Sequence, residues 1–179
     1  YPNYRDYMHA EMGRFSYSPA DLYNFHQAVE NVVIPFVREL DEHRRQVLGL
    51  EALRPWDVSV DLDGRVLKPF KTTTEFIDKC VKVLGKVNPE YGKQLEMMAN
   101  TGLLDLENRK GKAPGGYNTG INALGSSFIF MNHVKQHNDV VTLLHEAGHA
   151  MHSQAAAPIP IAPYLDTPSE VAELASMTM

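Results

Sequence analysis

The segment His145–Glu146–Ala147–Gly148–His149 constrains this chain more than any other part of its sequence. The residues around it, 140–151, are mostly apolar and contain no proline, which predicts a helix over residues 138–154. Two residues spaced four apart lie on one face of a helix, about 6 Å from each other. The two histidines of the segment can therefore bind one metal ion together.

This spacing is typical of zinc chemistry. Imidazole nitrogens bind zinc at about 2.0–2.1 Å, and zinc lowers the pKa of a bound water toward about 7. Glu146 follows the first histidine and can accept a proton from that water, so it is the candidate general base. We expect one Zn²⁺ per chain, bound by His145 and His149. The alternative, two core histidines hydrogen-bonded to their neighbours, fits less well with a glutamate between them.

Two histidines and a water leave one zinc ligand to be found. A metzincin would place a histidine six residues after His149, but that residue is Ala155. The other solution is a glutamate from a second helix. The segment Thr167–Glu170 predicts the start of such a helix, which would carry both Glu170 and Glu173. The two lie three residues apart and share a helix face, so the residues alone leave both open.

The rest of the sequence predicts a mainly helical chain with little sheet. Pro35 should kink or split the longest predicted helix. The apolar run 126–131 is the best strand candidate, and short extended pieces are expected around a turn at Asp63–Gly64. The remaining patterns predict helices over residues 3–14, 18–49, 74–86 and 88–100, and from 167 onward.

Composition excludes several classes of protein. A net charge of −5 and a pI of about 5.9 do not indicate a nucleic-acid-binding protein, which would normally carry a basic patch. The apolar stretches are far shorter than the roughly 20 residues that a membrane span needs. The only cysteine, Cys80, rules out an internal disulfide and allows a reducing compartment, although many secreted proteins also lack disulfides. The expected location is cytoplasmic. The oligomeric state is not indicated.

Several blocks of the sequence together resemble the oligoendopeptidase F family, whose members are relatives of thimet oligopeptidase. The blocks are Arg109–Tyr117, Phe128–Asn132 and Asp139–Ser153, with shorter matches at Tyr4–Met8 and Leu53–Asp57. The resemblance covers nearly the whole chain. It implies a zinc-dependent metalloendopeptidase that hydrolyses short oligopeptides by a zinc-activated water, with Glu146 as the general base.

The resemblance also bears on the third ligand. The family carries it in a Glu-x-x-Ser pattern, which Glu173–Ser176 fits and Glu170–Glu173 does not. This favours Glu173 as ligand, with Glu170 as a nearby residue at the start of the helix. A different gluzincin with Glu170 as ligand is the alternative. Asp139 is expected to cap the motif helix, or else to orient a ligand histidine.

The implied fold is mainly α, with a zincin-like catalytic region in which a small β-sheet lies beside the active-site helix. It belongs to a larger, two-lobed helical peptidase with a deep channel that admits short peptides. Residues 126–131 would form an edge strand, along which an extended substrate pairs by its main chain. The residues expected to bind substrate are Gly116, Tyr117, Phe128, Ile129, Phe130 and Met131.

Residues 1–179 are thus expected to be part of one catalytic domain. Its segments would be a helical one (1–50), a short extended or turn segment (51–71), helices with a Gly-rich loop and the edge strand (72–132), and the zinc-binding helices (133–179). The family holds the oxyanion with a Tyr/His segment further downstream, a contribution often worth several kcal/mol. The alternative is therefore a non-catalytic peptide-binding or structural fragment that retains the zinc motif.

Overall fold

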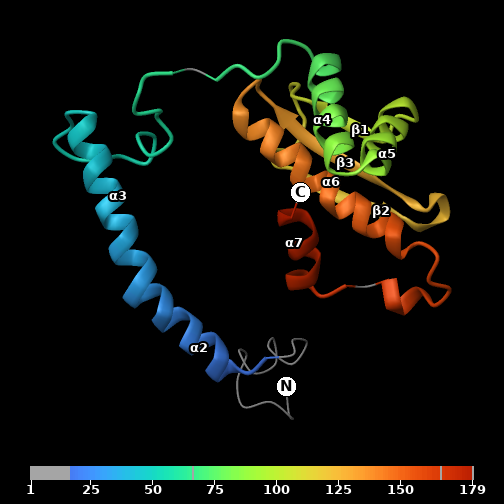
Figure 1. Ribbon diagram of the computed structural model, residues 1–179, viewed down its shortest axis with the longest axis horizontal. Helices are drawn as coiled ribbons and strands as arrows, with labels where there is room; N and C mark the ends of the chain where they lie inside the picture. The colour runs from blue at the N-terminus through green and yellow to red at the C-terminus, as the bar shows by residue number, and fades with distance from the viewer. Residues whose placement is uncertain (1–16, 66, 166, 179) are drawn as a thin grey trace. The chain divides into compact units, whose positions relative to one another are not determined.

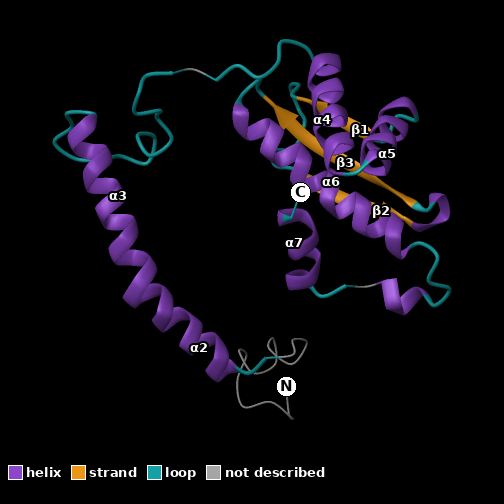
Figure 2. Ribbon diagram, viewed as in Figure 1, coloured by secondary structure: helices purple, strands orange, loops and turns teal. Residues whose placement is uncertain are grey.

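The computed structural model describes residues 17–65, 67–165 and 167–178 (Figure 1). The helix predicted over residues 3–14 lies outside these ranges. The chain divides into two compact units, residues 1–66 and 67–179. The division falls inside the segment 51–71 that the sequence predicts to be extended or turn-rich. As predicted, the fold is mainly helical with a small sheet (Figure 2).

The first unit is built on one interrupted helix. It begins with α2 (Pro19–Ala28), continues through a π-helical turn, η1 (Val29–Val33), and ends with α3 (Ile34–Val47). Ser18 caps the start, where its N–H donates to Asp21 Oδ2 at 2.8 Å. Pro35 lies in the first turn of α3, directly after the π turn. Proline has no N–H and its ring clashes with the carbonyl four residues earlier, so the helix widens there, as expected of an interruption at this residue.

Residues 48–65 form turns, and the extended pieces predicted there are absent from this described part of the chain. The predicted turn at Asp63–Gly64 is present: the N–H of Gly64 donates to the carbonyl of Asp61 at 3.1 Å, and Gly64 has a φ of 68°. An isolated two-stranded hairpin is marginally stable in water. The described residues on either side of this turn have no further strands to pair with, so they do not form a sheet.

The second unit contains the sheet. Within the described residues it has three strands, β1 (Leu104–Glu107), β2 (Tyr117–Ile121) and β3 (Ser126–His133). Their order is β1-β3-β2. Strand β3 runs parallel to β1 and antiparallel to β2, and Tyr117 is paired with Phe130. The sequence predicted only β3, which is the longest and most apolar of the three.

The sheet order corrects one expectation. Residues 126–131 do belong to the sheet, but β3 is its central strand, with β1 on one side and β2 on the other. Both edges of β3 are therefore hydrogen-bonded to neighbours, and no peptide can pair along it. The side chains of Ile129 and Met131 are buried in the core, and the ring of Phe130 stacks on Tyr117 with centroids 4.9 Å apart. Among the described residues, the strand that lies next to the motif helix and has one edge without a partner strand is β2.

The helices of the second unit follow the predictions closely. They are α4 (Thr73–Val87), α5 (Pro89–Asn100), α6 (His137–Ala156) and α7 (Ser169–Met177), with short 3₁₀ turns at Asn122–Leu124 and Ala162–Leu165. In Figure 1, α4, α5 and α6 gather around the sheet. The core lies between these helices and one face of the sheet, and includes Phe76, Cys80, Leu84, Leu95, Met98, Leu106, Ile129, Met131, Leu143, Ala147 and Ala150.

A tight turn leads from β3 into α6. Lys135 adopts a φ of 67° in this turn. The buried Asp139 caps the helix, because its Oδ2 accepts the backbone N–H of Val134 at 3.0 Å and that of Gln136 at 2.7 Å. This is the capping role that the sequence suggested for Asp139. None of the helices in the described ranges combines the length and apolar character that crossing a membrane requires.

Candidate metal and catalytic site

Two helices bring three candidate ligands together. His145 and His149 lie one turn apart on α6, and their rings are 4.9 Å apart, edge to face. Glu173 reaches them from α7: its Oε2 lies 3.3 Å from His145 Nε2, and its Oε1 lies 3.6 Å from His149 Nε2. One ligand atom from each residue can be chosen so that all lie within 4.8 Å of one another.

These three residues fit a zinc ion. A tetrahedral zinc with ligands at about 2.0–2.1 Å holds neighbouring ligand atoms about 3.4 Å apart. The 3.3 Å between Glu173 Oε2 and His145 Nε2 agrees with that value, and the other oxygen, Oε1, lies at a similar distance of 3.6 Å from His149 Nε2. Two neutral imidazoles and one carboxylate are also a common donor set of catalytic zinc sites.

Ser176 supports the glutamate from within α7. It is buried, and its hydroxyl lies 3.1 Å from Glu173 Oε2 and 2.9 Å from the backbone carbonyl of Glu173. A hydroxyl that donates to a ligating carboxylate fixes its orientation. The Glu-x-x-Ser pattern includes this residue, but the pattern alone does not assign a role to it.

Glu146 lies beside the three candidate ligands, and only 7% of it is exposed. Burial raises the pKa of its carboxyl, while His149, His145 and the backbone N–H of Asn118, which donates to the carboxylate, act in the opposite direction. Its Oε2 has no hydrogen-bond partner among the described residues. A buried carboxylate with a free oxygen can take up a proton from a neighbouring group.

A cavity of about 630 Å³ opens over this group. Its wall includes His145, Glu146, His149 and Glu173, and on the side of the sheet Gly116, Tyr117 and Asn118. Thus Gly116 and Tyr117, but not Phe128–Met131, line the cavity. His152 also lines it, one turn beyond His149.

Glu170 lies in the first turn of α7 and is exposed. It does not belong to the cluster of ligand atoms that His145, His149 and Glu173 form. Asp139 lies at the start of α6, where its carboxylate is occupied by the two backbone N–H groups of the cap.

Sequence reasoning missed the residues that hold the Gly-rich loop before β2. Lys112 has a buried side chain, and its Nζ contacts the carbonyls of Asp105, Glu107 and Met131 at 2.5–3.0 Å. Asn132 donates its side-chain amide to the carbonyls of Ala113 and Gly115. The loop is thereby fastened to β1 and β3. No local pattern would have identified Lys112, because its partners are mostly backbone carbonyls, which leave no mark in the sequence, and one of them, Met131, is 19 residues away.

The loop also packs closely against α6. A Cβ atom at Gly116 would lie 3.3 Å from Thr142 Cγ2, which is tighter than an ordinary contact. The absence of a side chain at this position therefore lets the start of β2 approach the motif helix. This approach is what brings the N–H of Asn118 to Glu146.

Comparisons with known proteins agree with this geometry. The sequence profile of peptidase family M3 matches residues 1–179. The chain is 26% identical over 163 residues to an oligoendopeptidase F homolog of Lactococcus lactis subsp. lactis, which covers 91% of this chain and 27% of the relative. It is 28% identical over 163 residues to oligopeptidase PepF of Bacillus subtilis, with 89% of this chain and 24% of the relative covered. The chain thus spans about a quarter of the length of these curated relatives.

A solved structure is similar as well. The structure of PZ peptidase A with an inhibitor matches 94% of this chain and 30% of its own, with a TM-score of 0.86 and 31% sequence identity. The described fold is therefore that of one part of a longer peptidase structure.

Proposed function

The chain belongs to peptidase family M3, and we propose that it supplies the zinc-binding part of a metalloendopeptidase that hydrolyses short oligopeptides. The resemblance to oligoendopeptidase F that the sequence indicates is confirmed by relatives of that name. The zinc dependence and the peptide substrates of the whole protein are proposed in addition to this family membership. The observation that carries it is the grouping of two imidazoles, one carboxylate and a buried Glu146 around a single open cavity.

In this proposal His145, His149 and Glu173 hold one Zn²⁺ per chain. When bound, zinc supplies Lewis-acid chemistry that makes water nucleophilic near neutral pH. Glu146 accepts the proton of the attacking water and carries it to the leaving amine. Its buried carboxyl group, with one oxygen that has no partner among the described residues, supports this role. Ser176 holds Glu173 in place, and Asn118 holds Glu146.

The substrate in this proposal is an extended peptide. Strand β2 has a free edge beside α6, and main-chain pairing along an edge tolerates many sequences. Gly116 and Tyr117 line the cavity next to Glu146 and are the proposed substrate contacts where the Gly-rich loop meets β2. Neither a nucleic acid nor a membrane is a proposed partner. A cytoplasmic location belongs to the same proposal and is supported only by the single cysteine, which allows a reducing compartment.

Metal content and peptide turnover, measured together, test the proposal. We expect about one zinc per chain, loss of zinc and of turnover after chelation, and return of both when zinc is added. The turnover assay uses a quenched fluorescent peptide of mixed sequence. A preparation that holds no zinc and cleaves no peptide would refute the proposal. A chain that holds zinc and binds peptides without cleaving them would favour the second candidate, a peptide-binding fragment.

The third ligand has its own test. Glu173→Ala should weaken zinc binding by more than about 100-fold, because removal of a ligand costs more than the 10–100-fold typical of an outer partner. Glu170→Ala, on the same helix, is the matched control and should retain nearly wild-type affinity. Competition with a zinc chelator measures both variants. The reverse order of affinities would assign the ligand to Glu170 instead.

A further inference from the structure

The outer edge of β2 has a defined hydrogen-bonding direction. In an antiparallel pair, each residue directs its N–H and C=O either both toward the partner strand or both away from it. The backbone N–H of Asn118 faces the carboxylate of Glu146 on α6 and lowers its pKa, so its backbone polar groups point away from β3. The pattern repeats every second residue. Gly120 therefore also presents its N–H and C=O to the open edge, two residues along the strand from the candidate base.

Gly120 also leaves a place on one face of the sheet empty. It is paired with Ser127, and Asn118 is paired with Ile129. The side chains of Ser127 and Ile129 are fully buried on the helix-covered face. Cross-strand partners share a face, so a side chain at position 120 would point to the same side. A Cβ atom there would have Asn122 Oδ1, 3.7 Å away, as its nearest neighbour, which means that the space is open.

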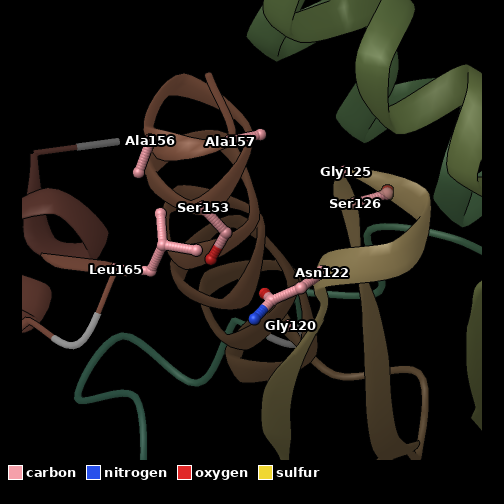
Figure 3. Close-up of a pocket in the computed structure, with 8 residues that line it drawn as sticks. All are labelled: Gly120, Asn122, Gly125, Ser126, Ser153, Ala156, Ala157 and Leu165. Carbon is pink, nitrogen blue, oxygen red and sulfur yellow. The ribbon is translucent and has the colours of Figure 1, made fainter. Parts of the chain in front are cut away.

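A cavity of about 200 Å³ occupies this place. Gly120 of β2 and Asn122 of the 3₁₀ turn that follows line it on one side, and Ser153, Ala156 and Leu165 line it on the other. Figure 3 shows the side chains of Asn122 and Ser153 facing the space between α6 and β2. The volume is far larger than the roughly 10–15 Å³ that one water molecule needs. It is sufficient for an amino-acid side chain.

The small cavity lies next to the candidate site. Ser153 and Leu165 line both it and the larger cavity over His145 and Glu173. A peptide that pairs with the free edge of β2 passes the candidate base at Asn118 and then reaches Gly120, about 7 Å further on. The peptide residue opposite Gly120 directs its side chain to the face that Gly120 leaves empty.

We propose that the cavity lined by Gly120, Asn122 and Ser153 is a specificity subsite that receives one uncharged, medium-sized side chain of an extended peptide. This inference rests on the proposed peptidase function. No charged side chain is among the described residues that line the cavity. A charged peptide side chain would lose its hydration there without gaining an ion pair, which is unfavourable. The amide of Asn122, the hydroxyl of Ser153 and the methyl of Ala156 suit aliphatic and amide side chains.

Gly120→Val is the variant that tests the subsite. Gly120 has an ordinary φ, and a Cβ atom there meets no close contact, so valine fills the cavity without straining the strand. Thr119→Val is the matched control. It adds the same side chain to the same strand, but Thr119 is exposed and paired with Phe128, so it faces the other side of the sheet.

The readout is peptide affinity, which does not require turnover. The probes are heptapeptides in which a methylene-amine group replaces the central peptide bond, so that they cannot be cleaved. One residue at a time, at the second or third position on either side of that bond, is Gly, Leu, Asp or Lys. Calorimetry gives the dissociation constants for zinc-loaded wild-type protein and for both variants. Zinc content is measured on each.

At one of these positions, we expect the wild type to bind the Leu peptide at least about tenfold more tightly than the Asp or Lys peptide, because of the uncompensated charge. Gly120→Val should remove most of this preference and change the affinity for the Gly peptide by less than about threefold. Thr119→Val should keep the wild-type preference. Equal losses for all peptides in Gly120→Val, or no loss for any, would overturn the proposal.

The subsite and the proposed function fail in different ways. A wild type that binds zinc and cleaves peptides but shows no side-chain preference at these positions keeps the function and loses the subsite. A wild type that shows the preference but cleaves no peptide keeps the subsite and loses the function. Absence of any binding by the heptapeptides refutes the subsite.

Discussion

At the scale of single residues, Glu146 is the group on which the proposed chemistry depends. Glu146→Gln preserves the size of the side chain and an oxygen that can accept the N–H of Asn118, but it removes the ability to take up a proton. We expect zinc content to be unchanged and kcat to fall by about 10²–10⁴-fold. Peptide turnover and zinc content of the purified protein measure the two effects.

A control for Glu146→Gln is Glu96→Gln, an exposed residue of α5 in which the same change in charge should leave turnover as it is. Near-normal turnover in Glu146→Gln would eliminate this residue as the base. Loss of zinc in the same variant would instead indicate that Glu146 helps to form the metal site.

Lys112 has a buried side chain whose amino group contacts three backbone carbonyls and the carboxylate of Asp105. Lys112→Met removes every one of these donors at once. Because buried acceptors without a donor are costly, we expect the free energy of unfolding to fall by about 2–4 kcal/mol. Lys110→Met, in an exposed position of the same loop, should change it by less than about 0.5 kcal/mol. Urea unfolding compares the two, and equal small effects would contradict the assigned role of Lys112.

The ion pair of Lys112 with Asp105 also makes the free energy of unfolding depend on pH. The guanidinium of Arg109, with Lys112 in addition, holds the pKa of Asp105 well below its usual range. A carboxyl group whose pKa is lowered by folding stabilises the fold above its unfolded pKa of about 3.9, and this contribution is lost as the pH falls through the folded value. The difference in stability between wild type and Lys112→Met should therefore narrow below about pH 4 without vanishing, because the carbonyl contacts remain. A difference that widens in acid would contradict it.

At the scale of elements, α4 and α5 cross at a point where there is no room for a side chain. A Cβ atom at Gly92 would lie 2.9 Å from both the carbonyl oxygen of Val81 and the Cα of Gly85. These atoms belong to the backbone, so Gly92→Ala must push the helices apart. We expect it to lower the free energy of unfolding by about 1–3 kcal/mol, as measured by thermal or urea unfolding.

Gly85→Ala provides the matched control. Its Cβ atom would have only Gly92 Cα, at 4.0 Å, within reach. Alanine is favoured over glycine inside a helix by roughly 0.5–1 kcal/mol, so this variant should be as stable as the wild type or more stable. Equal destabilisation by both variants would show that the close crossing is not what Gly92 provides.

Local signals were sufficient to predict the helices. Ser18, Thr72 and Asn88 each accept a backbone N–H at a helix start, and proline follows two of them. Such caps act over three or four residues and can be read directly. The strands β1 and β2 were missed because each has only four or five residues. Their partners lie far along the chain, as in the pairing of Leu104 with Ile129. The sheet order, and with it the central place of β3, depends on such pairings.

In the candidate site, too, some residues could be predicted from local patterns and others could not. The spacing of His145 and His149 is a local property of one helix, and the Glu-x-x-Ser pattern pointed to Glu173. The contact between Asn118 and Glu146 depends on how the loop after Lys112 packs on α6. That packing involves residues 26 positions apart in sequence, Gly116 and Thr142, for which the sequence offers no local sign.

At the scale of the whole molecule, the two units differ in what holds them together. No residue in the described range 17–65 is buried. The buried apolar core, from Phe70 to Met151, lies entirely in the second unit, as do all three candidate zinc ligands. Burial of apolar surface is the main favourable contribution to folding. In the 179-residue chain on its own, we therefore expect the backbone amides of the second unit to exchange hydrogen slowly, and those of the first unit to exchange much faster.

Zinc binding should increase this difference in amide hydrogen exchange between the two units. A ligand that binds only the folded form stabilises it by about 2.7 kcal/mol at a concentration of 100 times its Kd, which slows exchange through any opening that breaks the site about 100-fold. Because α6 and α7 supply the ligands, we expect zinc to slow amide hydrogen exchange in residues 137–177 and to leave residues 17–65 unchanged. Mass spectrometry of the exchanging 179-residue chain, with and without zinc, measures this. Protection confined to α6 would show that Glu173 does not complete the site. Equal protection in both units would show that they open as one cooperative body.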